Sequence, residues 1–216
     1  TVVKNFLEDY YCTSEAWSVL ISVQKVLRAS NSWLYSQGQT AKYKFESSYD
    51  QNKGYVCTLS AMILKSNTAY IFHVGDTRIY RVCGKHLEQL TKDHRLWIDE
   101  HKNYLSRAIG IDKFCEIDYQ SITLQEDDVF VIASAGVYQW LSADKIADVV
   151  HQYRNDFDMA AKEIVTRALK AGSNDNLTVQ IIRIDSLPIV KLSEVQEKVF
   201  ELPLPPVLEP RMKFDG

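Results

Sequence analysis

Three short polar turns, each next to an apolar run of strand-like sequence, constrain this chain more than any other feature. The turns are Gly75-Asp76, Ser134-Ala135-Gly136 and Ser173-Asn174-Asp175-Asn176. Strands that end in this way carry carboxylates to one edge of a sheet, where hard divalent cations find the oxygen ligands that they prefer. The middle turn has an alanine where that chemistry requires an acid, so the function of the chain depends on Ala135.

The composition favours one domain with its own core. The chain has 216 residues, of which 46% are hydrophobic, and a formal net charge of -3. This length supports one sizeable core plus a tail, and the lack of a basic surplus argues against nucleic acid or an anionic membrane surface as a partner. No apolar run reaches the roughly 18–20 residues of a membrane span, and the first residues lack the pattern of a signal peptide.

The cysteines form neither a zinc-binding pattern nor a disulfide framework. Cys12, Cys57, Cys83 and Cys115 are scattered, with no C-x-x-C spacing. We therefore expect reduced thiols and a cytoplasmic location. The sequence starts at Thr1 without an initiator methionine, so we expect it to begin inside a longer protein.

Hydrophobic periodicity predicts an α+β fold. Apolar residues at helical spacing indicate two packed helices within residues 1–37, and the polar, aperiodic residues 39–53 predict a loop. Short apolar runs separated by turn dipeptides then predict an antiparallel meander of four strands, followed by further strands, two amphipathic helices and a closing strand. The strands are expected at residues 56–64, 69–74, 77–82, 86–90, 117–124, 129–133 and 177–184, and the helices at residues 142–153 and 159–169. Helices grouped in blocks around an antiparallel sheet are typical of the α+β class.

The composition changes after Asp185. Residues 193–200 predict a short helix, and residues 202–210 are too rich in proline for the interior of a helix or strand. We therefore divide the chain into a domain at residues 1–185 and a tail at residues 186–216, in which an extended linker leads toward another domain.

Each motif, taken alone, also has a purely structural interpretation. Gly75-Asp76 is typical of a two-residue hairpin turn, and the turn around Asp175 is typical of a helix end that precedes a strand, here one expected to be central. A single histidine such as His94 is more often a surface or structural residue than a ligand, and residues 103–110 fit a short helix. The acidic residues 126–128 are typical of a solvated turn.

Several common catalytic signatures are absent from the sequence. There is no G-x-S-x-G elbow, no Cys-His arrangement at a strand-to-helix junction, and no glycine-rich loop of the phosphate-binding type. The sequence therefore argues against nucleophilic catalysis by a side chain, and against a kinase or a nucleotide hydrolase.

Six motifs, in this order, resemble the type 2C family of metal-dependent serine/threonine protein phosphatases. They occupy residues 56–59, 74–81, 90–94, 104–110, 128–137 and 173–179, and the resemblance extends over residues 1–184. The resemblance implies a sandwich of two antiparallel sheets flanked by helices, in α-β-β-α order, with two or three Mg or Mn ions at one end.

The resemblance also implies a reaction. In that family, an ion-bridged water attacks the phosphorus of phosphoserine or phosphothreonine, and no covalent enzyme intermediate forms. The ions lower the pKa of the water, orient the phosphate and offset charge on the departing oxygen. No catalytic side chain is needed as the nucleophile, and the implied partners are phosphorylated proteins.

Candidate metal ligands are carried over by position. Asp175 corresponds to a late ligand of the ion core, and Asp76 to an aspartate associated with a more weakly held third ion. The family's Ser/Thr-Asp-Gly motif is Ser134-Ala135-Gly136 here, so Ala135 stands where the family has a metal-binding aspartate. The family's early acidic pair, and the Asp-Gly that bridges both ions, would lie upstream of Thr1. The sequence identifies no substrate-binding residues.

We expect weak or no phosphatase activity from the sequence as written. Losing an acid lowers ion affinity, but the fold is expected to persist, because fewer carboxylates repel one another when no ion is bound. If Ala135 is natural, the domain is expected to be a non-catalytic pseudophosphatase, a regulatory or phosphoprotein-binding module. If Ala135 is engineered, it silences or traps the enzyme. A phosphatase-fold regulator that acts on one small partner protein is a third alternative.

The tail carries a second resemblance. Residues 209–216 and the preceding linker resemble the segment that joins such phosphatase domains to a protein kinase domain in some bacterial fusion proteins. A kinase domain linked on the C-terminal side is therefore an expected partner.

Overall fold

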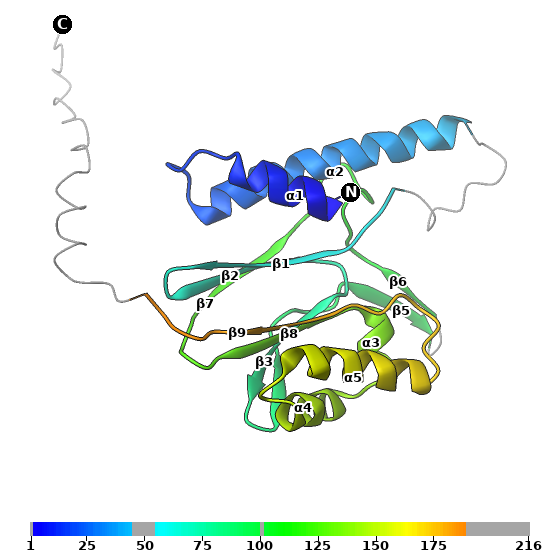
Figure 1. Ribbon diagram of the computed structural model, residues 1–216. Coiled ribbons are helices and arrows are strands. Elements are labelled where there is room, and N and C mark those ends of the chain that lie inside the picture. Colours follow the sequence, from blue (N-terminus) through cyan, green and yellow to red (C-terminus); the bar gives the residue numbers. More distant parts are fainter. Residues whose placement is uncertain (1, 45–54, 100–101, 189–216) are drawn as a thin grey trace, which may run out of the picture.

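The computed structural model describes residues 2–44, 55–99 and 102–188, and its elements stack in four layers. Helices α1 and α2 cover a three-stranded sheet, which faces a four-stranded sheet, and helices α4 and α5 cover the far side of that second sheet (Figure 1). Both sheets are antiparallel. The α+β class and the α-β-β-α sandwich are therefore confirmed.

The first sheet and its helices share one apolar core. The elements are α1 (Val2–Tyr11), α2 (Val19–Lys44), β1 (Leu59–Lys65), β2 (Thr68–Val74) and β7 (Asp118–Thr123), with strand order β1-β2-β7. One apolar face of α2 packs against Phe72 and Val74 of β2. That face consists of Val19, Val23, Val26, Leu27 and Leu34. Burial of this face, more than intrinsic helix propensity, fixes α2 on the sheet.

The second sheet forms a separate core with the C-terminal helices. The elements are β3 (Arg78–Cys83), β4 (His86–Gln89), β8 (Val129–Ala133), α3 (Ala135–Tyr138), α4 (Ala143–Gln152), α5 (Phe157–Lys170) and β9 (Val179–Arg183), with strand order β4-β3-β8-β9. Val131 of β8 packs with Ile146 of α4 and Ile164 of α5. The side chains of Ser142 and Asp156 cap the first turns of α4 and α5, as is usual for these residue types.

Strand β2 is buried on both faces, which explains its nearly continuous apolar sequence. Because side chains alternate along a strand, Phe72 faces the helices, whereas Ala69 and His73 face the other sheet. Ala69 packs there with Phe130 and Leu124. His73 is 2% exposed, so an imidazole lies in the layer between the two sheets.

The chain crosses from one sheet to the other at Gly75-Asp76. Strands β2 and β3 do not pair with each other, although β1–β2 and β3–β4 are hairpins as expected. The hairpin-turn interpretation of Gly75-Asp76 and the single four-stranded meander are therefore wrong. Gly75 has a φ of +112°, and a Cβ atom there would lie 2.3 Å from Thr58 Cγ2. The crossing requires glycine for both reasons.

Three other local expectations also differ from the structure. Helix α2 continues through residues 39–44, which were expected to form a loop, because this stretch contains no proline and several good helix formers. Residues 103–110 do not form a helix, because β6 (Lys102–Leu105) pairs with β5 (Arg95–Asp99) in a separate hairpin. Strand β9 lies at the edge of its described sheet and not at the centre.

Some expectations fall on residues that the structure does not describe. Residues 45–54, the helix expected at residues 193–200 and the proline-rich linker lie outside the described ranges. Among the helices within those ranges, none combines the length and the apolar composition needed to cross a bilayer.

The crossing predicts a large stability effect at Gly75. Gly75→Ala is expected to lower the free energy of unfolding by about 2–4 kcal/mol, because the methyl group meets Thr58 and the positive φ is unfavourable for an L residue. Gly84→Ala is the matched control: its φ is +62°, but no atom lies within 4 Å of an added Cβ. We expect that control to lose only about 1 kcal/mol. Urea unfolding measures both, and equal losses would contradict a steric role for Gly75.

Candidate active site

The second and third polar turns are bound to each other. Ser134 Oγ accepts the Thr178 N–H at 3.0 Å and donates to the Asn176 carbonyl at 3.1 Å. A Cβ atom added to Gly136 would lie 2.7 Å from the Asn176 carbonyl oxygen and 3.2 Å from Asp175 Cβ. Only a residue without a side chain allows this approach, which brings the turn that contains Ala135 against Asp175.

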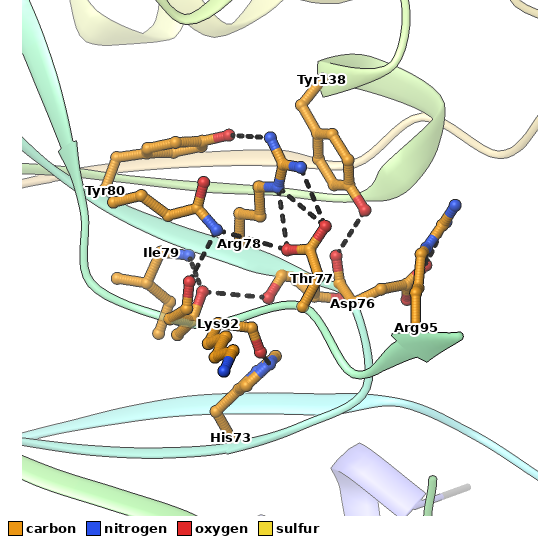
Figure 2. Close-up of polar contacts among 12 residues, drawn as sticks. His73, Asp76, Thr77, Arg78, Ile79, Tyr80, Lys92, Arg95 and Tyr138 are labelled. Atoms are coloured by element: carbon orange, nitrogen blue, oxygen red, sulfur yellow. Dashed lines mark hydrogen bonds and ion pairs between the residues drawn. The ribbon is translucent and has the colours of Figure 1, made fainter. Parts of the chain in front are cut away.

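The first turn joins them through Tyr138 at the end of α3. The Tyr138 hydroxyl donates to the Asp76 carbonyl oxygen at 2.7 Å (Figure 2). Burial, followed by the nearby Asp76 carboxylate, raises the pKa of Tyr138, so its hydroxyl keeps the proton that it donates. All three turns therefore meet at one edge of the sandwich, around the short helix α3.

Arg78, two residues after Asp76, holds β3 against α3. Its guanidinium donates to both oxygens of Asp93, with Nε–Oδ1 at 2.9 Å and Nη2–Oδ2 at 2.8 Å. It also donates to the Tyr80 hydroxyl at 3.2 Å and lies 3.7 Å from the centre of the Tyr138 ring (Figure 2). Burial opposes the charge of Arg78, but the hydrogen bonds from Arg78 to Asp93 and Tyr80 raise its pKa. The cation is thus fixed by Asp93, the Tyr80 hydroxyl and the face of the Tyr138 ring.

Asp76 is buried and already bound to a cation. Its residue is 8% exposed, and its Oδ2 accepts from both Nε and Nη2 of Arg95, the former at 2.9 Å. In the amide orientation that satisfies both groups, the Gln139 side-chain oxygen accepts from Nη1 and Nη2 of Arg95 at 2.8 Å each. Arg95 is the first residue of β5, which, like β6, was not expected from the sequence.

His94 clamps the crossing in place. The Gly75 N–H donates to His94 Nδ1 at 3.0 Å, and the His94 N–H donates to the Gly75 carbonyl at 2.8 Å. Because a backbone N–H can only donate, His94 Nδ1 must be the unprotonated nitrogen, and Nε2–H donates to Asp118 Oδ2 at 3.0 Å. The structural interpretation of His94 is therefore the correct one, although its particular role was not visible in the sequence.

Asp118 connects this clamp to another sequence motif. Its second oxygen accepts from Arg107 Nη1 at 2.7 Å, and Arg107 belongs to the motif at residues 104–110. Burial raises the pKa of Asp118, but the hydrogen bonds from His94 and Arg107 outweigh burial and hold that pKa below its usual value. Sequence reasoning attached no chemistry to Arg107, because nothing local to it indicates a partner 11 residues away.

The described residues do not complete a site for two divalent ions. Asp175 is exposed, and its Oδ1 accepts the Asn176 N–H at 2.7 Å. The side chain of Ala135 offers no ligand atom, and Asp76 is bound by Arg95. Within residues 2–44, 55–99 and 102–188, no three His, Cys, Asp or Glu side chains gather closely enough to hold a metal. The assignment of Asp175, Asp76 and position 135 to a metal site stays a prediction.

Comparison with known proteins gives a consistent family. The Protein phosphatase 2C family profile matches residues 104–177. The chain is 27% identical over 191 residues to "Serine/threonine phosphatase stp" of Listeria welshimeri, an alignment that covers 78% of this chain and 73% of the relative. It is also 27% identical over 174 residues to "Protein phosphatase PhpP" of Streptococcus pneumoniae, with coverage of 72% and 65%, so this chain spans less than two thirds of that relative.

Solved structures share the fold. The catalytic domain of the serine/threonine protein phosphatase PstP, solved in complex with two manganese ions, superimposes with a TM-score of 0.67 at 21% identity. The superposition covers 83% of this chain and 77% of the PstP chain. At this level of identity, the likeness supports the sandwich architecture of both sheets and their flanking helices.

His73 predicts a pH dependence of stability. Its Nε2–H donates to the Lys92 carbonyl at 3.0 Å, and its Nδ1 lies 2.8 Å from Ser60 Oγ. Burial, followed by the nearby His94, lowers the pKa of His73. The folded protein therefore keeps this ring neutral, whereas the unfolded chain binds a proton near pH 6.5. The unfolded state therefore binds more protons than the folded state below pH 6.5. The free energy of unfolding falls as the pH drops from that value toward the lower pKa of His73 in the folded protein.

The test replaces His73 by a residue that does not titrate. His73→Gln keeps a donor for the Lys92 carbonyl, and we expect the free energy of unfolding to fall less steeply below about pH 6.5 than in the unchanged protein. His151→Gln, at an exposed position of α4, is the control and should keep the original slope. Urea unfolding at a series of pH values gives both slopes. The same slope in all three proteins would exclude His73 as the cause.

Proposed function

We propose that the chain is a serine/threonine phosphatase domain of the type 2C family of metal-dependent protein phosphatases, and that its activity, as the sequence stands, is weak or absent. Its substrates would be phosphoserine and phosphothreonine in proteins. In the complete family site, Mg or Mn ions supply the charge that activates water and stabilises the phosphate. The described acids of this chain do not complete such a site, and we attribute part of this deficit to Ala135.

The position of Ala135 is the observation that carries this proposal. Ala135 is the first residue of α3 and directly follows β8, and the next residue, Gly136, is pressed against Asp175. A carboxylate at position 135 would lie beside that of Asp175, at the edge where the three turns meet. Two neighbouring carboxylates attract a divalent ion far more strongly than one, because ion affinity rises with the number of charged ligands.

The cellular setting is part of the same proposal. All four cysteines are free thiols, which supports a reducing compartment, and we place the domain in the cytoplasm. The domain boundary near residue 185 follows β9, which ends at Arg183. We further propose phosphorylated proteins as partners, and a kinase domain linked through the tail at residues 186–216.

A second candidate function is a non-catalytic regulatory or phosphoprotein-binding module. One observation favours it: direct hydrogen bonds between protein groups hold together the edge of the sandwich where the three turns meet. Tyr138 binds the Asp76 carbonyl, Arg95 binds the Asp76 carboxylate, and Ser134 joins the second and third turns. A domain whose three turns are fixed by such hydrogen bonds can present a rigid surface to a partner without catalysing the reaction.

Restoring the acid distinguishes the two functions. We expect Ala135→Asp, in the full-length protein, to raise Mn-dependent phosphate release from a phosphothreonine peptide by about 10–100-fold, because losing even an indirect metal contact typically costs that much. Ala16→Asp adds the same charge at an exposed position between α1 and α2 and is expected to change nothing. Phosphate release can be followed by a colorimetric assay with Mn and with EDTA.

The outcomes separate cleanly. Activity that appears only with Ala135→Asp and Mn establishes the enzyme and makes Ala135 the cause of its silence. Absence of activity in every variant contradicts the phosphatase proposal and leaves the non-catalytic module. Activity in the unchanged protein equal to that of Ala135→Asp would show that position 135 is not a ligand position.

A further inference from the structure

We propose that Arg95 is a built-in cation for Asp76, so that this carboxylate is neutralised by the protein itself and does not recruit a divalent ion. The resemblance to the type 2C family associates the equivalent of Asp76 with a weakly held ion, and the guanidinium takes that place here. The proposal relies on the family placement of Asp76, but not on the chain being an active phosphatase.

The contact is buried and directional. The side chains of Asp76 and Arg95 are each 12% exposed. Two nitrogens of the guanidinium, Nε and Nη2, both donate to one carboxylate oxygen, Asp76 Oδ2. Because both partners are charged, these hydrogen bonds are stronger than bonds between neutral groups. The side-chain oxygen of Gln139, the C-cap residue of α3, accepts from the two terminal nitrogens and fixes the plane of the guanidinium.

Backbone contacts of the neighbouring residues place Asp76 and Arg95 next to each other. Gly75 and His94 exchange two hydrogen bonds, and Asp76 and Arg95 are the next residues on each segment. The two side chains therefore leave adjacent backbone positions, and Figure 2 shows Arg95 beside Asp76. Because the geometry is preset, little conformational entropy is lost when the ion pair forms.

A divalent ion competes poorly for this carboxylate. It would have to break both hydrogen bonds to Oδ2 in a site with little access to water, where separating paired charges is costly. Asp175 differs, because it is exposed and lies against the turn that contains Ala135.

The test compares Mn binding and thermal stability in variants of the full-length protein. Mn should shift the melting temperature of Asp76→Asn by the same amount as that of the unchanged protein, because Asp76 does not bind the ion. Arg95→Gln should lower the melting temperature in EDTA by about 5–10 °C, since it leaves a buried carboxylate without its partner. Mn should restore part of that loss, and the restoration should vanish in Arg95→Gln/Asp76→Asn.

Two further variants control for general effects of substitution. Arg95→Lys keeps a cation beside Asp76, and it should stay folded and show no Mn response that depends on Asp76. Arg183→Gln removes an arginine from an exposed pair with Asp185 and should leave the melting temperature within about 1 °C of the unchanged value. Mn binding measured by calorimetry should show one additional site in Arg95→Gln relative to the unchanged protein.

Two results overturn the proposal. One is a Mn response of the unchanged protein that Asp76→Asn abolishes, because the ion would then displace Arg95. The other is an Arg95→Gln protein whose melting temperature and calorimetric binding do not respond to Mn. Neither result depends on phosphate release, so failure of Ala135→Asp to give activity would leave these measurements unchanged.

Discussion

The pair of hydrogen bonds between Gly75 and His94 is the contact on which the candidate site depends. The chain leaves one sheet and enters the other at Gly75, and a passage this narrow leaves no room for a side chain. His94 binds Gly75 through both its backbone N–H and its ring Nδ1, and the hydrogen bond to Asp118 fixes the ring in the required tautomer. The Asp76–Arg95 pair follows directly from this clamp, because these two residues come next after Gly75 and His94 in the chain.

The layer between the sheets changes from apolar to polar along its length. Ala69, Leu124 and Phe130 fill one part with hydrocarbon, whereas His73 and His94 occupy another, with ring centres 4.8 Å apart. Buried polar groups destabilise a fold unless they are hydrogen-bonded, and within the described residues every buried side-chain nitrogen and oxygen has a partner. The polar part therefore defines one arrangement of the two sheets, since other arrangements would leave these groups unpaired.

Sequence periodicity predicted the elements better than their partners. The helix expected at residues 142–153 is α4, Ala143–Gln152, because a strong apolar stripe and the Ser142 cap are both local signals. The separation of β2 from β3 was missed, because Gly75-Asp76 has the same local chemistry as a hairpin turn. Arg95 could not be matched with Asp76, 19 residues away, because a charged residue at the start of a short strand gives no periodic signal.

The two carboxylates at the edge where the three turns meet have opposite environments, and this difference bears on the proposed catalysis. Asp76 is covered by a guanidinium that cannot dissociate from the chain, whereas Asp175 remains exposed. A divalent ion is exchangeable and can move charge onto a bound phosphate, but a guanidinium locked to a carboxylate has little net charge left to offer. We therefore propose that any ion bound by the unchanged protein at this edge lies around Asp175 and position 135. The segment that contains Asp76 is fixed by Arg95, and through the hydrogen bond from Tyr138 it holds α3, the helix that begins at Ala135, in place.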